Sequence, residues 1–226
     1  MINIIKTELA VLIFCLCFTP PITAGQFEDG LAAYRHGDYE TALTLWIKAA
    51  EQGNASAQNN LGSMYSSGTG VQKNSSEAVK WYLKAAEQGV VDAQYNLGVM
   101  YIHGEGVKEN DVEAVKWFRK AADKGNISAL NNLGQMYASG RGGIPKDDAQ
   151  AVHYFRKAAE QGNANAQYSL AEMYSLGHGV NKDEIEALKY YKEAAAQGQP
   201  LAINRLHEMG IEIHGNSRLV SPLIIR

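Results

Sequence analysis

The sequence predicts an all-α protein built as a solenoid of antiparallel helix pairs. A five-residue string, first seen as Leu61-Gly62-Ser63-Met64-Tyr65, returns three times at spacings of 36, 36 and 37 residues. A second string, of the form aromatic-x-x-Ala-Ala-x-x-Gly, moves in step with it through five copies. No strand pattern of useful length interrupts the two strings. A fixed period of this length is the signature of a stacked repeat array.

The first 24 residues are typical of a secretory signal peptide. Lys6 precedes an apolar run from Leu9 to Phe18, and small Ala24 suggests cleavage before Gly25. The run is about half of the roughly 20 residues that a membrane-spanning helix needs, and a Pro-Pro pair follows it. We expect an exported chain, periplasmic or secreted, with no membrane span after signal removal. A retained anchor is the alternative.

Cysteine content and charge exclude several classes of function. Cys15 and Cys17 both lie in the apolar run, so the mature chain has no thiol for a disulfide, a nucleophile or a metal site. The chain carries 21 Lys+Arg against 24 Asp+Glu, a formal net charge of -3. Without a basic surplus to neutralise phosphates, nucleic acid is not an expected partner.

The first helix of each unit carries an apolar stripe. In the first full unit, Ala57, Leu61, Met64 and Tyr65 fall at i, i+4, i+7 and i+8, which is one helix face. Gly62 lies beside that stripe, where the lack of a side chain lets a neighbouring helix approach closely.

The second helix carries large aromatic residues beside small alanines. Trp81 and Tyr82 share its face with alanines before and after them. Trp46, Trp81 and Trp117 are interpreted as lying at one helical phase and as packing between repeats, rather than as a ligand-stacking stripe.

The ends of the helices are marked by glycine and by capping residues. Glycines after each Ala-Ala pair are expected to close the second helices, and Pro200 suits the first turn of another helix. Asn74, Asp111, Asp147 and Asp183 are the expected N-caps of the second helices. The longer third spacing is assigned to the loop Arg141-Gly142-Gly143-Ile144-Pro145. The predicted organisation is a signal peptide (1–24), an N-terminal capping helix pair with a shortened first helix (25–53), four repeats (54–89, 90–125, 126–162 and 163–198) and a C-terminal capping helix and tail (199–226).

This pattern resembles the Sel-one-like repeat family, a relative of the tetratricopeptide repeats. Its units read Ala-x-x-x-Leu-Gly-x-x-Tyr-x-x-Gly-x-Gly-Val and then Ala-x-x-Trp-x-x-Lys-Ala-Ala-x-x-Gly. The resemblance implies a right-handed superhelix with a concave inner surface that binds other proteins, and no common chemistry. One secreted, cysteine-rich branch carries a disulfide in each repeat and is linked to penicillin binding or hydrolysis. This chain departs from that branch, since no cysteine follows Cys17.

The repeat separates structural positions from candidate binding positions. The expected structural core is Leu61, Gly62, Tyr65, Trp81, Leu97, Gly98, Tyr101, Trp117, Leu133, Gly134 and Tyr137. By analogy with tetratricopeptide grooves, the residues two before and two after each core leucine are expected to face the hollow. The first column is Asn59, Tyr95, Asn131, Tyr168 and Asn204, and the second is Ser63, Val99, Gln135 and Glu172. Amides and phenols there can hydrogen-bond an extended peptide backbone, or they bond within and between repeats.

No catalytic, metal or cofactor motif is apparent. The six histidines share no repeat phase and form no His-x-x-x-His pair, and the Gly-x-Gly connectors follow helices rather than strands. We therefore expect an exported, non-enzymatic scaffold with a protein or peptide partner. Two alternatives stay open: an envelope enzyme or receptor for cell-wall fragments or beta-lactams, and a structural subunit of an envelope complex. The tail from Gly210 either folds back over the last helix or docks on a partner, and the oligomeric state is left open.

Overall fold

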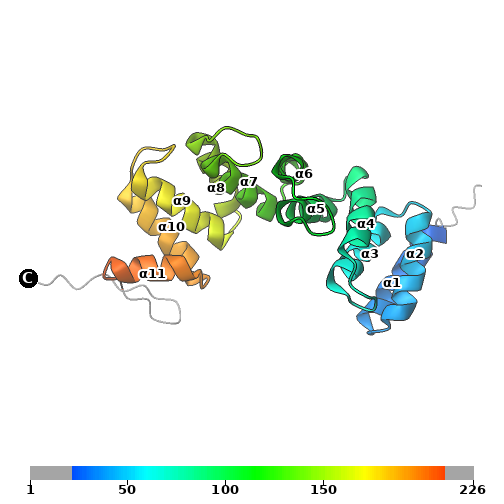
Figure 1. Cartoon of the computed structure of the whole chain (residues 1–226). Coiled ribbons are helices and arrows are strands. Elements are labelled where there is room, and N and C mark those ends of the chain that lie inside the picture. Colours follow the sequence, from blue (N-terminus) through cyan, green and yellow to red (C-terminus); the bar gives the residue numbers. More distant parts are fainter. Residues whose placement is uncertain (1–21, 212–226) are drawn as a thin grey trace, which may run out of the picture.

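The computed structural model describes residues 22–211, and within them the chain folds into eleven α-helices without a β-strand (Figure 1). Residues 1–21, with most of the predicted signal peptide and both cysteines, and residues 212–226, with most of the tail, lie outside the described part. In chain order the helices are α1 (Ile22–Arg35), α2 (Tyr39–Glu51), α3 (Ala55–Ser67), α4 (Ser75–Glu87), α5 (Val91–His103), α6 (Asp111–Asp123), α7 (Ile127–Ser139), α8 (Asp148–Ala159), α9 (Ala164–Leu176), α10 (Glu184–Ala196) and α11 (Pro200–Glu208).

The helices stack as five antiparallel pairs, from α1–α2 to α9–α10, with α11 as a single last helix (Figure 1). Each second helix packs most extensively on the first helix of its own pair and then on the first helix of the next pair. The predicted all-helical solenoid is confirmed. Helix α1 has 14 residues, of which those from Gly25 to Arg35 follow the expected cleavage site, and α2 and α3 have 13 residues each.

Side-chain caps start most of the helices. Asn74, Asp147 and Asp183 cap α4, α8 and α10 as predicted, each accepting backbone N–H bonds from the first turn. The prediction for Asp111 is wrong by one residue, because Asn110 caps α6 and accepts from the N–H groups of Val112 and Glu113. Asp111 is the first residue of that helix.

A column of aromatic side chains lies flat on glycines of the first helices. A Cβ atom added to Gly62, Gly98 or Gly134 would lie 2.5–2.6 Å from the ring of the second helix in the same pair. The rings are, in chain order, Tyr82, Phe118 and Phe155, and Trp46 lies against Gly30 in the same way. Trp46 therefore belongs to this column, which corrects its assignment to the phase of Trp81 and Trp117.

The aromatic column one residue earlier packs between neighbouring pairs at its two tryptophans and within a pair at its two tyrosines. Trp81 packs against the buried cluster of α2 and α3, and Trp117 against the cluster of α4 and α5. The equivalent Tyr154 and Tyr190 stack on tyrosines of their own first helices, with ring centroids 5.4 and 6.0 Å apart. Lysine amines lie over Trp81 and Trp117 at 4.2 and 4.0 Å from the ring centroids, so these rings have one face toward the interior and one toward a cation.

The Gly-x-Gly connectors lie in close contact with the preceding helix pair. Gly106 and Gly179 have φ angles of +72° and +67°, and a Cβ on either would overlap the backbone of Ser75 or Asp148. Those residues lie in the first turn of the preceding second helix. Only glycine permits both the left-handed conformation and the close approach. In the longer third connector, Gly142 takes this place against Asp111 and Val115.

Candidate binding groove

The first helices α3, α5, α7, α9 and α11 form one layer of the solenoid, which we call the inner layer. Within it α3 contacts α5 and α7 contacts α9, and no two successive second helices of the described chain contact each other as extensively as these two pairs do. The layer whose helices are closer together lies on the inside of a curved stack.

Four pockets open between successive first helices of the described chain. The α5–α7 pocket has a volume of about 480 Å³, the α7–α9 pocket about 320 Å³, and the α9–α11 and α1–α3 pockets about 240 Å³ each. Gln135 lines both the α5–α7 and the α7–α9 pocket, and Glu172 lines both the α7–α9 and the α9–α11 pocket. Three consecutive pockets therefore share their boundary residues and form one groove.

The column two residues after each core leucine lies in these pockets. Ser63 lines the α1–α3 pocket, and Val99 lines the α5–α7 pocket together with Gln135. Glu172 follows in the next two pockets, and the same position on α11 adds Glu208.

The column two residues before the leucines is divided. Tyr168 and Asn204 line the α9–α11 pocket, while Tyr95 tilts over Phe118 with ring centroids 5.9 Å apart. Asn131 differs from expectation, because only 7% of it is exposed. Its Oδ1 atom, like that of Asn59, is buried without a hydrogen-bond partner in the described chain. This column therefore faces the groove at α9 and α11, where Tyr168 lines two adjacent pockets, but not at α7.

A third column that the sequence reasoning missed lines the groove instead. It lies one residue before each core leucine: Asn60, Asn132, Ser169 and Arg205 line the four pockets in chain order. The available signal was that this position is polar in every repeat although the repeat pattern leaves it free.

Buried glutamines, also missed, join one pair to the next. The Nε2 atoms of Gln58 and Gln94 each donate 3.0 Å hydrogen bonds to carbonyls near the end of the preceding helix. Gln167 makes the equivalent bond at 3.3 Å, and Leu130 replaces the glutamine on α7. These bonds satisfy carbonyl groups that a helix end leaves open.

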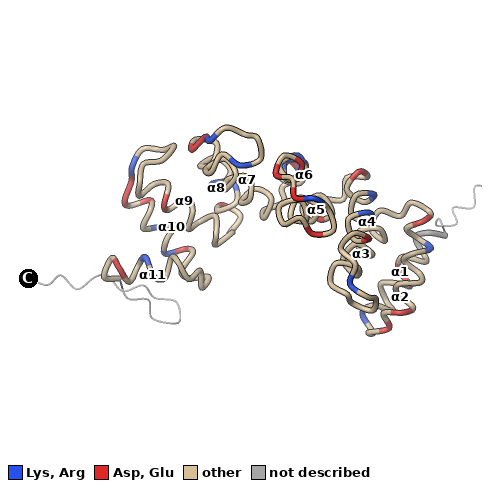
Figure 2. The backbone as a smooth tube through the Cα atoms, in the orientation of Figure 1, with Lys and Arg blue, Asp and Glu red and all other residues tan. Residues whose placement is uncertain are grey.

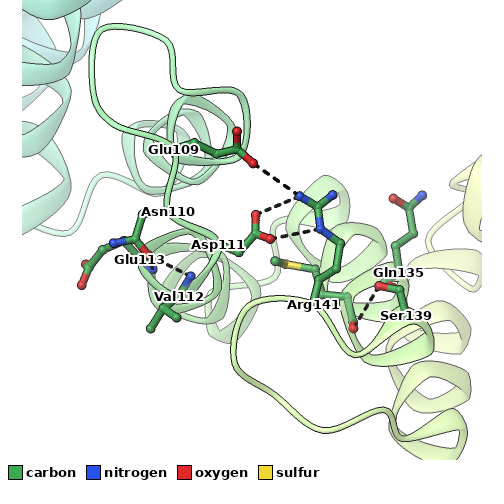
Figure 3. Close-up of polar contacts among 9 residues, drawn as sticks. Glu109, Asn110, Asp111, Val112, Glu113, Gln135, Ser139 and Arg141 are labelled. Atoms are coloured by element: carbon green, nitrogen blue, oxygen red, sulfur yellow. Dashed lines mark hydrogen bonds and ion pairs between the residues drawn. The ribbon is translucent and has the colours of Figure 1, made fainter.

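The α5–α7 end of the groove has a cation at its rim. Arg141 makes two 3.0 Å hydrogen bonds to Asp111, and Glu109 lies 4.0 Å away (Figure 3). Ser139 donates to the Gln135 carbonyl on the same side (Figure 3). The insert of the third connector therefore ties α7 to the start of α6.

The α9–α11 end holds two carboxylates and one guanidinium. Arg205 bonds to Glu208 at 3.0 Å and lies 3.9 Å from Glu172, which also accepts from the Tyr191 hydroxyl. Burial and the Glu172 carboxylate raise the pKa of Tyr191, so the hydroxyl stays protonated and donates. The hydrogen bond to Glu208 raises the pKa of Arg205 above its ordinary value, so the guanidinium stays charged.

Elsewhere on the described part of the chain, charged residues of both signs are interspersed (Figure 2).

Within residues 22–211 no group of three or more His, Cys, Asp or Glu side chains is placed to hold a metal ion. None of the described helices is long and apolar enough to cross a membrane.

The Sel1 repeat family model matches residues 24–54, 55–90, 91–126, 127–163 and 164–199. The chain belongs to the Sel1 repeat family. The last four matches lie one residue after the four repeats expected from the sequence, and the first match, 24–54, covers the helix pair that was expected to be a cap. Sel1 repeat proteins are generally non-enzymatic scaffolds for protein–protein interaction.

Solved structures of Sel1 repeat proteins share the fold. One from Oxalobacter formigenes is 40% identical with a TM-score of 0.78, and the match covers 85% of this chain and 82% of that one. A protective antigen of uropathogenic Escherichia coli strains is 37% identical with a TM-score of 0.78, covering 83% of this chain and 41% of the antigen. This Sel1 repeat chain thus spans about two fifths of the antigen's length. No curated protein matches the chain.

Proposed function

We propose that this Sel1 repeat chain is an exported, non-enzymatic scaffold that binds a protein or peptide partner along its inner layer. The observation that carries the proposal is the groove of three consecutive pockets joined by Gln135 and Glu172. A continuous groove fits an extended segment better than a compact small molecule, because its pockets repeat with the helices that line it.

Export to the bacterial envelope or beyond is the second part of the proposal. Its support is the charged start, the apolar run and the small residue at position 24. Expression with the native N-terminus, followed by cell fractionation and N-terminal sequencing, is expected to give an exported chain that begins at Gly25. A full-length chain retained in the cytosol contradicts this part alone.

The groove assignment is tested with a matched pair of variants. Gln135 is exposed between two pockets, so Gln135→Arg places a large cation at their shared boundary. Gln150 is equally exposed but lies on the second helix α8, so Gln150→Arg makes the same change outside the groove. In affinity capture from the native cell envelope, we expect Gln135→Arg to lose the partner and Gln150→Arg to keep it. A partner kept by both variants, with unchanged helicity by circular dichroism, contradicts the assignment.

A further inference from the structure

The first two pockets of the groove have apolar walls. Val99, Ile102, Phe118 and Met136 line the α5–α7 pocket, with the amides of Asn132 and Gln135 beside them. The α7–α9 pocket has four other apolar side chains, Ala138, Phe155, Met173 and Leu176, and Glu172 lies at the boundary that it shares with the α9–α11 pocket. Each pocket therefore suits an apolar side chain whose backbone lies within reach of polar groups.

The third pocket differs in charge. Between α9 and α11, Glu172 and Glu208 share the single guanidinium of Arg205, which leaves one negative charge uncompensated among the lining residues. One oxygen of each carboxylate is engaged by Tyr191 or Arg205, and the second oxygen has no hydrogen-bond partner among residues 22–211. Tyr168 and Leu201 form the wall, against which the alkyl stem of a lysine or arginine can pack.

The spacing of the pockets selects a backbone conformation. An α-helix with its side chains is about 10–12 Å across, so pockets that recur once per first helix are separated by roughly that distance. A polyproline II segment rises about 3.1 Å per residue with three residues per turn, so every third side chain lies on one face at about 9 Å intervals. Such a segment presents one side chain to each pocket.

We propose that the groove binds an extended partner segment with two apolar residues and one basic residue at every third position, the basic residue lying between α9 and α11. The assignment rests on the proposed scaffold function and adds the chemistry of the partner to it. The two apolar side chains enter the α5–α7 and α7–α9 pockets, and the cation bonds to Glu172 and Glu208.

The test uses a blocked, fluorescein-labelled peptide, Leu-Pro-Ser-Leu-Pro-Ser-Arg, in both chain orders, and the same peptides with norleucine in place of arginine. Fluorescence anisotropy at low ionic strength measures their affinity for the full chain. We expect at least one chain order to bind about two- to five-fold more tightly with arginine, as for a pair of partly exposed charges. Equal affinity of the arginine and norleucine peptides in both orders overturns the proposal.

A matched pair of double variants locates the effect. Glu172→Gln/Glu208→Gln removes both groove carboxylates while keeping their shapes, and it should abolish the preference for arginine. Glu113→Gln/Glu186→Gln removes two carboxylates that make i,i+3 pairs with lysines on the second helices α6 and α10, and it should keep the preference. A preference kept by the groove variant, folded by circular dichroism, overturns the proposal.

Three further results separate the alternatives. If Gln135→Arg releases the native partner but the wild-type chain does not prefer the arginine peptide, the scaffold function stands and the charge assignment fails. If Gln135→Arg changes neither partner capture nor peptide binding, both fail. If the peptide binds only after residues 212–226 are removed, the C-terminal segment of the same chain occupies the groove, and the proposal of a partner segment is overturned.

Discussion

At the residue scale, the contact between a helix glycine and an aromatic ring determines how closely the two helices of a pair approach. Leu61, Leu97 and Leu133 are fully buried, but the glycine after each one lets the facing ring reach the helix backbone. In the fourth repeat, Ala171 takes the glycine position and is itself fully buried opposite α10. The fourth repeat therefore accommodates a methyl group at the position where the other three repeats have glycine against an aromatic ring.

We predict that Gly98→Ala destabilises the protein although alanine is the better helix former. The new Cβ would lie 2.5 Å from the Phe118 ring, which is almost fully buried and has little room to move. Overpacking of this kind costs about 1–3 kcal/mol, more than the roughly 1 kcal/mol that alanine gains in helix propensity. Urea unfolding measures the difference.

The companion variant Phe118→Leu tests the cause. If ring and methyl group compete for one space, Gly98→Ala/Phe118→Leu loses less stability than the sum of the single changes. Additive losses would show that the cost of Gly98→Ala has another origin.

At the element scale, one helix start departs from its sister helices. Asn54, Asn126 and Asn163 cap α3, α7 and α9, each accepting a backbone N–H bond at 2.8–2.9 Å. Val90 occupies the same place before α5 with nearly the same backbone angles, but it has no side-chain oxygen to accept such a bond. The backbone is already in the conformation that a cap requires.

We predict that Val90→Asn raises the free energy of unfolding by about 0.5–2 kcal/mol, because the new side chain accepts the N–H of Ala93. Asn126→Val is the matched reverse change and should lower stability by a similar amount. Both are measured by thermal and urea unfolding. A loss of stability in Val90→Asn would mean that the half-buried valine contributes more by packing than a cap does.

The sequence predicts where the helices begin and end better than it predicts which side of each helix faces the groove. Short-range sequence patterns predict the helix ends, the insert in the third connector and the face of the helix that carries Leu61 and its equivalents. Each of these features depends on neighbours within about 10 residues. Which side of α7 faces the groove depends on how each pair is rotated relative to the next, which no single repeat encodes. The sequence therefore predicts Asn131 for the groove and not Asn132, whereas the structure buries Asn131 and places Asn132 in the α5–α7 pocket.

Two other differences have local causes. Residue type groups Trp46 with Trp81 and Trp117, whereas in the structure Trp46 has the place of Tyr82 and Phe118, one position later in the repeat. The sequence pattern does not indicate that Gln58 and its sister glutamines are buried, because polar side chains are mostly exposed. The bond to an open helix carbonyl makes the burial possible.

At the scale of the whole molecule, the buried core is not uniform. From α6 to α11 the buried side chains form one continuous cluster, whereas the N-terminal half is divided into a cluster around α4 and α5 and another around α2 and α3. In a linear array, each repeat is stabilised only by its neighbours, so smaller clusters open more readily.

We predict that amide hydrogen exchange is faster in α2 to α5 than in α7 to α9. Mass spectrometry of exchanged peptic fragments at neutral pH resolves the two groups of helices. Gln94, whose Oε1 is buried without a partner in the described chain, lies on the less protected side. Uniform protection along the array would show that the clusters act as one cooperative core.

The overlap of each Gly-x-Gly connector with the helix before it bears on how such an array gains or loses length. Each repeat carries both sides of this contact. Its connector glycine contacts the preceding repeat, and the start of its second helix is contacted by the glycine of the next repeat. A repeat that is duplicated in register therefore carries both sides of the contact with its neighbours. When a repeat is deleted in register, the two repeats that become adjacent can form the same contact. The third connector, in which an inserted glycine takes over the contact, shows that this contact tolerates a longer loop as long as a residue without a side chain reaches the backbone it faces.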